Sequence, residues 1–204
     1  MNIDASMALA EPLVFTAEGC RLTAWLDTLP DPPVWTIGHG NTWVDGHAVH
    51  AGMTCTMLQA DAWGAFELRK VAEQVLGKVK VPIDDFQLAA LTSLAYNIGI
   101  GGFAKSSVLE AVNLGLMQVA ADRFLEYDEA GGKKIAGLET RRARERALFL
   151  TAMRDPVGDH GTPIAAPAAL TADALNEQEL DKLQSGKRLT GHQSPSEPDP
   201  PPAA

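Results

Sequence analysis

The 204-residue chain is predicted to fold as an α+β domain that is mainly helical. Its expected plan has a small β-hairpin lobe and a larger helical lobe, and three observations support that prediction. A short helix ends near Gly19 and leads into a hairpin. From Thr56 to Phe149 the apolar spacing is mostly helical, and capping residues mark the helix starts. Beyond Arg154 the composition becomes rich in Pro and Ala, so residues 1–154 are predicted to be the folded domain.

The first helix places an acidic residue at its end. Leu13, Val14 and Ala17 form one apolar stripe, and Gly19 supplies a residue that tolerates a left-handed helix terminus. Glu18 is therefore expected in the last helical turn, where the negative end of the helix dipole disfavours a charged carboxylate. Such a position favours the protonated form, which a general acid working near neutral pH needs. The simpler alternative is a solvated surface glutamate.

A second carboxylate and a hydroxyl follow on a predicted hairpin. Asp27 lies nine positions after Glu18, before a turn-rich segment, and residues 34–37 have the composition of a returning strand that contains Thr36. Two carboxylates across a sugar are the requirement of glycoside hydrolysis, in which one protonates the leaving oxygen and the other activates water or stabilises the transition state. A threonine hydroxyl can hold that water by a hydrogen bond.

These residues resemble the active-site signature of the phage-type lysozymes, or endolysins, of glycoside hydrolase family 24. The resemblance is carried by Glu18-Gly19, Asp27 and the segment Thr36-Ile37-Gly38-His39-Gly40. It implies that Glu18, Asp27 and Thr36 are the catalytic trio. It also implies a lysozyme fold, no metal or organic cofactor, and hydrolysis of the β-1,4 bond between N-acetylmuramic acid and N-acetylglucosamine in peptidoglycan.

The spacing within the hairpin departs from the family pattern. Eight residues separate Asp27 from Thr36, three more than the family more often has. We interpret the difference as an insertion at the hairpin tip, within residues 29–33, where added loop length costs little free energy. Asp31, inside this segment, is the alternative second carboxylate.

Two later blocks extend the resemblance and supply candidate substrate-binding residues. The apolar helix at residues 87–99 ends with Asn97, which either binds the sugar chain or caps its helix. The helix at residues 137–149 contains Arg141 and Arg142, one of which is expected to reach Glu18 or to orient substrate. The alternative for both is a solvated basic face. His39 either touches substrate or packs beside the sheet.

Capping residues mark the long helices after the hairpin. Thr56 with Gln59 forms a capping-box pattern at the start of a helix long enough to join two lobes, and Asp84 begins a second, strongly apolar helix. In the first of these helices, Trp63 and Phe66 are expected to pack in the core or between the lobes.

Composition limits the partners. The net charge of −9 argues against nucleic acid. Residues 155–204 carry −5 of that charge and are predicted to form a disordered tail, whereas residues 1–154 carry only −4 and can approach an anionic cell wall. The chain is expected to act as a monomer.

Cys20 and Cys55 are expected to be free thiols, and His47, His50 and Cys55 lack the spacing of a metal site.

The expected route to the wall follows from two further features. Residues 1–12 lack the pattern of a signal peptide, and no apolar run approaches the ~20 residues of a membrane span. We therefore expect synthesis in the cytoplasm and action on the wall in the periplasm, and the family resemblance implies release through a separate holin. Two alternatives to a muramidase remain: a lytic transglycosylase, which needs a single Glu, and a non-catalytic wall-binding protein.

Overall fold

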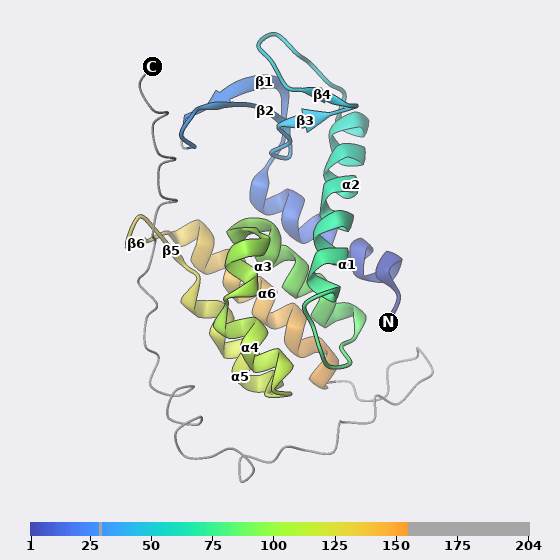
Figure 1. The fold of residues 1–204 in the computed structure, drawn as a ribbon, viewed down its shortest axis with the longest axis vertical. Coiled ribbons are helices and arrows are strands. Elements are labelled where there is room, and N and C mark those ends of the chain that lie inside the picture. Colours follow the sequence, from blue (N-terminus) through green and yellow to red (C-terminus); the bar gives the residue numbers. More distant parts are fainter. Residues whose placement is uncertain (29, 155–204) are drawn as a thin grey trace, which may run out of the picture. The chain divides into compact units, whose positions relative to one another are not determined.

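The computed structural model describes residues 1–28 and 30–154 (Figure 1). The α-helices of this part of the chain are α1 (Ile3–Glu18), α2 (Met57–Leu76), α3 (Asp85–Ala104), α4 (Ser107–Asn113), α5 (Met117–Arg123) and α6 (Ala136–Arg154), and a 3-10 helix covers Phe124–Glu126. The antiparallel ribbons pair β1 (Arg21–Asp27) with β2 (Val34–Gly38), β3 (Trp43–Val44) with β4 (His47–Ala48), and β5 (Glu129–Ala130) with β6 (Lys133–Lys134). The predicted α+β, mainly helical class is confirmed.

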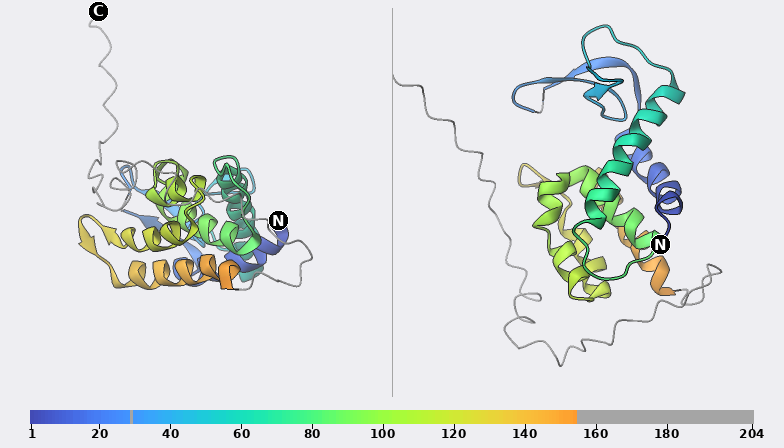
Figure 2. Two further views of the ribbon diagram at one scale, coloured as in Figure 1. Left: turned by 90° about the horizontal axis from the view of Figure 1, so that it is seen from below. Right: turned by 45° about the vertical axis from the view of Figure 1, so that its right-hand side comes forward.

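The first two pairs of strands lie at one end of α2 and the remaining helices lie toward its other end (Figures 1 and 2). We call the described part of residues 19–56 the small lobe and residues 85–154 the helical lobe. The two lobes are joined by α2, a helix that the sequence predicted to be long enough for this role. Thr56 accepts the Gln59 backbone N–H, and the Gln59 side chain accepts the Thr56 backbone N–H, so the capping box is present in full.

The α1 helix is longer than the sequence predicted. It begins at Ile3, capped by Asn2, and it runs through Pro12 to Glu18. Its buried face, which includes Met7, Ala10 and Val14, packs in a cluster with residues of α2 and α3. This tertiary packing explains why a helix with an internal proline persists, although proline removes one backbone hydrogen bond.

The end of α1 fixes the position of Glu18. Gly19 follows with φ +70° and ψ −169°, a conformation that is nearly restricted to glycine. The Gly19 backbone N–H still donates to the Phe15 carbonyl at 3.0 Å. The chain therefore leaves the helix abruptly after Glu18 and enters β1 at Arg21, with only two residues between the elements.

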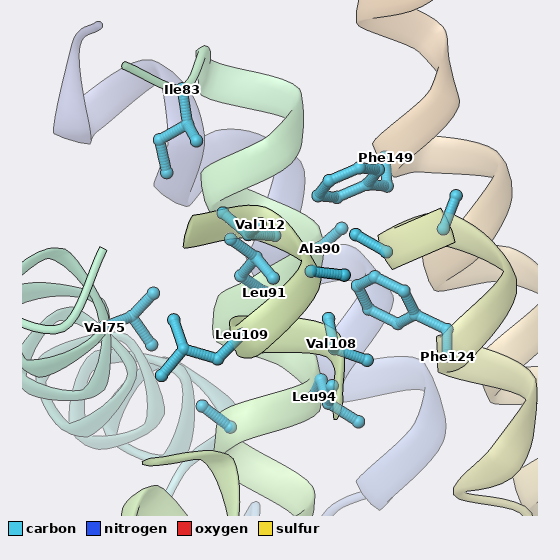
Figure 3. Close-up of a cluster of buried hydrophobic side chains, with 14 of the residues drawn as sticks. Val75, Ile83, Ala90, Leu91, Leu94, Val108, Leu109, Val112, Phe124 and Phe149 are labelled. Carbon is cyan, nitrogen blue, oxygen red and sulfur yellow. The ribbon is translucent and has the colours of Figure 1, made fainter. Parts of the chain in front are cut away.

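The helical lobe has a large apolar core (Figure 3), formed mainly by α3, α4, α5 and α6. Helix α3 is buried along most of its first three turns. The sequence predicted that this helix ends at Gly99. Gly99 does break the helical dihedral angles, with φ +75°, but helical residues resume and continue to Ala104.

The small lobe has its own compact core of Ile37, Val44 and Val49, against which Trp63 packs from α2. The expectation of packing thus holds for Trp63, but it is wrong for Phe66. The Phe66 side chain is largely exposed, and Lys70 covers one face of its ring at 4.6 Å from the centroid.

The predicted tail, residues 155–204, lies outside the described part of the chain. Within residues 1–28 and 30–154, no helix combines the length and the apolar character that a membrane span requires.

Candidate active site

Glu18 lies at the C-terminus of α1, as the sequence predicted, and its side chain is 27% exposed. It lines a cavity of about 500 Å³ together with residues of α1, α3 and α6. Its Oε1 accepts a hydrogen bond from Arg141 Nη1 at 2.6 Å. The acid is therefore open to a ligand and at the same time held by a cation from the far end of the domain sequence.

The structure distinguishes the two arginines that the sequence left equivalent. Arg141 reaches Glu18, whereas the Arg142 side chain is completely buried and donates to Asn97 Oδ1 at 3.0 Å and to Glu145 Oε1 at 3.0 Å. Full burial gives Arg142 no surface to offer a glycan, so we assign it a supporting role instead of substrate binding. Burial lowers the pKa of Arg142, and the neighbouring Glu145 carboxylate opposes that effect.

Asn97 does not cap its helix, whose C-cap is Lys105, and its binding to the sugar chain stays a prediction. Its side chain lines the same cavity as Glu18, and its Oδ1 accepts the hydrogen bond from Arg142. Asn97 is half-buried, and Arg142 holds its side chain at the cavity wall.

Asp27 and Thr36 lie on the β1–β2 ribbon, in neighbouring register positions. Asp27 pairs with Val34, and Trp25 pairs with Thr36. Because side chains alternate between the faces of a strand, residues 25, 27, 34 and 36 share one face of the ribbon. Asp27 and Thr36 are thus diagonal neighbours, a relation in which long side chains and bridging ligands reach both residues.

The two residues differ in their local environment. Asp27 is half-buried at the end of β1, whereas Thr36 is buried and its hydroxyl donates to the Val34 carbonyl at 3.4 Å. Asp31, the alternative carboxylate, lies in the turn beyond the paired residues and is exposed. The register therefore favours Asp27 as the partner of Thr36.

His39 lies next to the acid but is turned away from solvent. Its side chain is 5% exposed, Nδ1 is 2.6 Å from the Gly19 carbonyl, and Nε2 is 2.8 Å from Asp61 Oδ1. The ring also stacks on Phe15, with centroids 4.0 Å apart. Both ring nitrogens are thus engaged within the protein, so the packing alternative describes His39 better than substrate contact does.

A tyrosine joins this region to the helical lobe. The Tyr96 hydroxyl donates to the His39 carbonyl at 3.3 Å. Burial, reinforced by the negative charges of Glu18 and Glu67, raises the pKa of Tyr96 to about 12. Tyr96 is therefore a neutral hydrogen-bond donor at physiological pH.

Cys20 and Cys55 are both free thiols and half-buried. Burial raises the pKa of each thiol, so neither has the lowered pKa of a reactive cysteine. In the described part of the chain, no group of three or more His, Cys, Asp or Glu side chains is arranged to hold a metal ion.

Three residues around the site were not predicted from the sequence: Glu145, Ser93 and Asp61. Glu145 lies three and four positions after the paired arginines, a spacing that places all three side chains on one helix face. Ser93 is a polar residue within an apolar helix, and a buried hydroxyl needs a partner. For Glu145 and Ser93 these signals were available, but only the structure shows that the two side chains meet.

Comparisons with known proteins show which family the chain resembles. The model of the family described as phage lysozyme matches residues 16–145. The endolysin of Salmonella phage P22 is 44% identical over 135 residues, which cover 66% of this chain and 90% of the relative.

Two solved structures extend the likeness to the fold. A crystal structure of a P22 lysozyme variant superposes with a TM-score of 0.62 and 40% identity, covering 69% of this chain and 94% of the other. The muramidase domain of SpmX from Asticaccaulis excentricus gives a TM-score of 0.60 and 35% identity, with the same coverage of both chains. This chain belongs to the phage lysozyme family, and it is a glycoside hydrolase of the endolysin type.

Proposed function

We propose that this muramidase cleaves the β-1,4 bond between N-acetylmuramic acid and N-acetylglucosamine with Glu18 as general acid. Asp27 is the carboxylate that activates water or stabilises the positively charged transition state, and Thr36 positions the water. The observation that carries the proposal is the placement of Glu18: it ends a helix, lines the cavity and leads directly into the ribbon that bears the other two residues.

The arrangement gives each residue a step. A protonated Glu18 donates to the glycosidic oxygen as the bond to the anomeric carbon breaks, so the leaving sugar departs as a neutral alcohol. Asp27 accepts a proton from a water molecule that attacks the opposite face of the sugar, and the Thr36 hydroxyl orients that water. Attack on the opposite face inverts the configuration at the anomeric carbon, which is the outcome that the family suggests.

Arg141 completes the site in the absence of substrate. Its guanidinium holds the Glu18 side chain in one orientation, and ordering a catalytic group before substrate arrives lowers the entropy that has to be lost on binding. Asn97, on the cavity wall, is the remaining candidate for a hydrogen bond to the glycan.

Analysis of the products tests the reaction type. Purified peptidoglycan digested with the enzyme should release fragments that end in reducing N-acetylmuramic acid, identified by mass spectrometry. Fragments that end in 1,6-anhydro sugars would instead identify a lytic transglycosylase. Binding to the sacculus with no soluble product would identify a wall-binding protein.

We further propose that the enzyme acts as a monomer on the periplasmic wall after release through a holin. The route rests on the family, and the monomeric state rests on the position of Glu18, Asp27 and Thr36 on adjoining elements of one chain. Co-expression with a holin tests the route: lysis should require both proteins, and lysis by this chain alone would indicate another form of export.

A further inference from the structure

Three further charged groups lie behind Glu18. We call Arg141, Arg142 and Glu145 the cluster. Glu145 on α6 is fully buried, between the guanidinium groups of Arg141 and Arg142. Its Oε1 accepts from Ser93 Oγ at 2.6 Å and from Arg141 Nε at 3.1 Å, and its Oε2 lies 2.8 Å from Arg142 Nε. Removing a carboxylate from water is costly, so a buried apolar residue would serve stability at least as well.

We propose that Glu145 is a positioning residue for the catalytic acid: it fixes the guanidinium of Arg141, cancels one positive charge beside Glu18, and so sets the pH range in which Glu18 delivers its proton. The inference rests on the proposed role of Glu18 as general acid, and it goes beyond that role by naming the group that controls it.

The guanidinium of Arg141 is planar, and its three nitrogens point in fixed directions. Nε donates to Glu145 and Nη2 donates to the Ser93 carbonyl at 3.1 Å, so Nη1 is directed at Glu18. Glu145 and the α3 backbone thus orient the contact that holds the acid.

Arg141 and Arg142 carry two positive charges, and Glu18 and Glu145 balance them. Without the charge of Glu145, both arginines would act on Glu18 alone and would favour its ionised form, in which it cannot donate a proton. Because the cluster is buried, these charges are weakly screened.

Other groups around the cluster do not replace Glu145. From α3, Tyr96 approaches Glu18 and Arg141, but it is neutral below pH 10 because its pKa is raised to about 12. Glu67 on α2 acts on Tyr96 and is half-buried. Arg144 lines the cavity from α6 and is exposed, so solvent screens its charge. From α3, Ser93 and Asn97 contribute neutral hydrogen bonds.

The experiment compares pH profiles of kcat/KM on soluble peptidoglycan fragments. In Glu145→Gln the alkaline limb, which reports loss of the proton from the acid, should move to lower pH by about one unit, the size expected for removal of one nearby charge. In Arg142→Gln the same limb should move to higher pH. Glu139→Gln removes the same charge from an exposed position on α6 and should leave the limb in place.

Opposite shifts separate positioning from a merely structural role, which would lower the rate in both variants without moving the limb. Glu145→Asp keeps the charge and should keep the limb, even if its shorter side chain lowers the rate. Thermal unfolding followed by circular dichroism identifies the folded variants. If Glu145→Gln does not fold, Arg142→Gln and the charge-balanced double variant decide, since the double variant should restore the limb.

An unmoved limb in the folded variants, with Glu18→Gln inactive, would overturn this inference and leave the proposed function intact. Retained activity in Glu18→Gln would overturn the proposed function itself, whatever the limb does.

Discussion

Two anchors hold the end of α1, one from each lobe, and they differ in kind. On the small-lobe side, His39 bridges the Gly19 carbonyl and Asp61, whose side chain is 47% exposed. On the helical-lobe side, Arg141, Arg142 and Glu145 are almost completely out of contact with solvent. Solvent screens the charge of the first anchor, whereas the second retains its full electrostatic effect.

The comparison suggests that the two anchors act by different means. The small-lobe anchor acts mainly by close packing, because His39 is stacked on Phe15 and both rings lie against Gly64. The helical-lobe anchor acts by charge and by directed hydrogen bonds. Stability should therefore respond to side-chain volume on the first side and to charge on the second.

Loss of Arg141 should have the largest effect. Arg141→Met leaves Glu18 without its cation and removes one of the two cations that face buried Glu145, so the free energy of unfolding should fall by about 3 kcal/mol. Urea denaturation measures this change. Arg146→Met is the matched control on the same helix: its pair with Asp122 is partly exposed, and its loss should cost less than ~1 kcal/mol. Equal losses would remove the distinction between buried and exposed charge.

High pH should lower the stability of the protein through Tyr96, which joins the helical lobe to the His39 carbonyl. The pKa of Tyr96 is about 12 in the folded protein and 10 in the unfolded chain. Above pH 10 the unfolded chain therefore loses the phenolic proton while the folded chain keeps it. Stability then falls as the pH rises from 10 to 12, by up to roughly 2–3 kcal/mol.

The Tyr96→Phe variant isolates this contribution. It lacks the titrating hydroxyl, so its free energy of unfolding should fall less than that of the wild type between pH 10 and 12, as measured by urea denaturation at each pH. At pH 7 it should be less stable by about 1 kcal/mol because the bond to the His39 carbonyl is lost. Parallel declines for the two proteins at high pH would exclude Tyr96 as the source.

A larger side chain at position 64 tests the packing of the small-lobe anchor. A Cβ there would lie 2.8 Å from Phe15 Cε1 and 3.2 Å from His39 Cδ2, so Gly64→Ala has to displace the stacked rings. We expect a loss of about 1–3 kcal/mol. Gly101→Ala, also in a helix, meets no atom within 4 Å and should instead stabilise the protein slightly. Stabilisation by both substitutions in thermal unfolding would contradict the packing argument.

The charge of Asp61 should matter least. Asp61→Asn keeps the size of the side chain and removes its charge, and because the carboxylate is half in solvent we expect a loss below ~1 kcal/mol at pH 7. Urea denaturation measures it. A loss as large as that of Arg141→Met would show that the small-lobe anchor also depends on charge.

Local sequence signals predicted the parts of the fold that are decided locally. Glu18 before Gly19, the capping box at Thr56 and the hairpin that bears Thr36 all depend on neighbouring residues, and all are present in the structure. The start of α1 was missed because packing against α2 and α3 outweighs Pro12.

The supporting part of the site was not predictable in the same way. The segment Arg141 to Glu145 reads equally well as a solvated helix face, and its burial depends on α3, which the sequence pattern does not place against α6. Likewise, the choice between Arg141 and Arg142 as the partner of Glu18 required the helix orientation. Long-range packing decides these contacts.

The most direct measurement is the rate at which Glu18→Gln hydrolyses soluble peptidoglycan fragments. The glutamine keeps an oxygen that accepts the Arg141 hydrogen bond, so the variant should fold, but it has no proton to give the leaving sugar. We expect a rate about 10²–10⁴-fold below that of the wild type. A folded Glu18→Gln protein that retains the wild-type rate within a few-fold would contradict the assignment of Glu18 as the general acid.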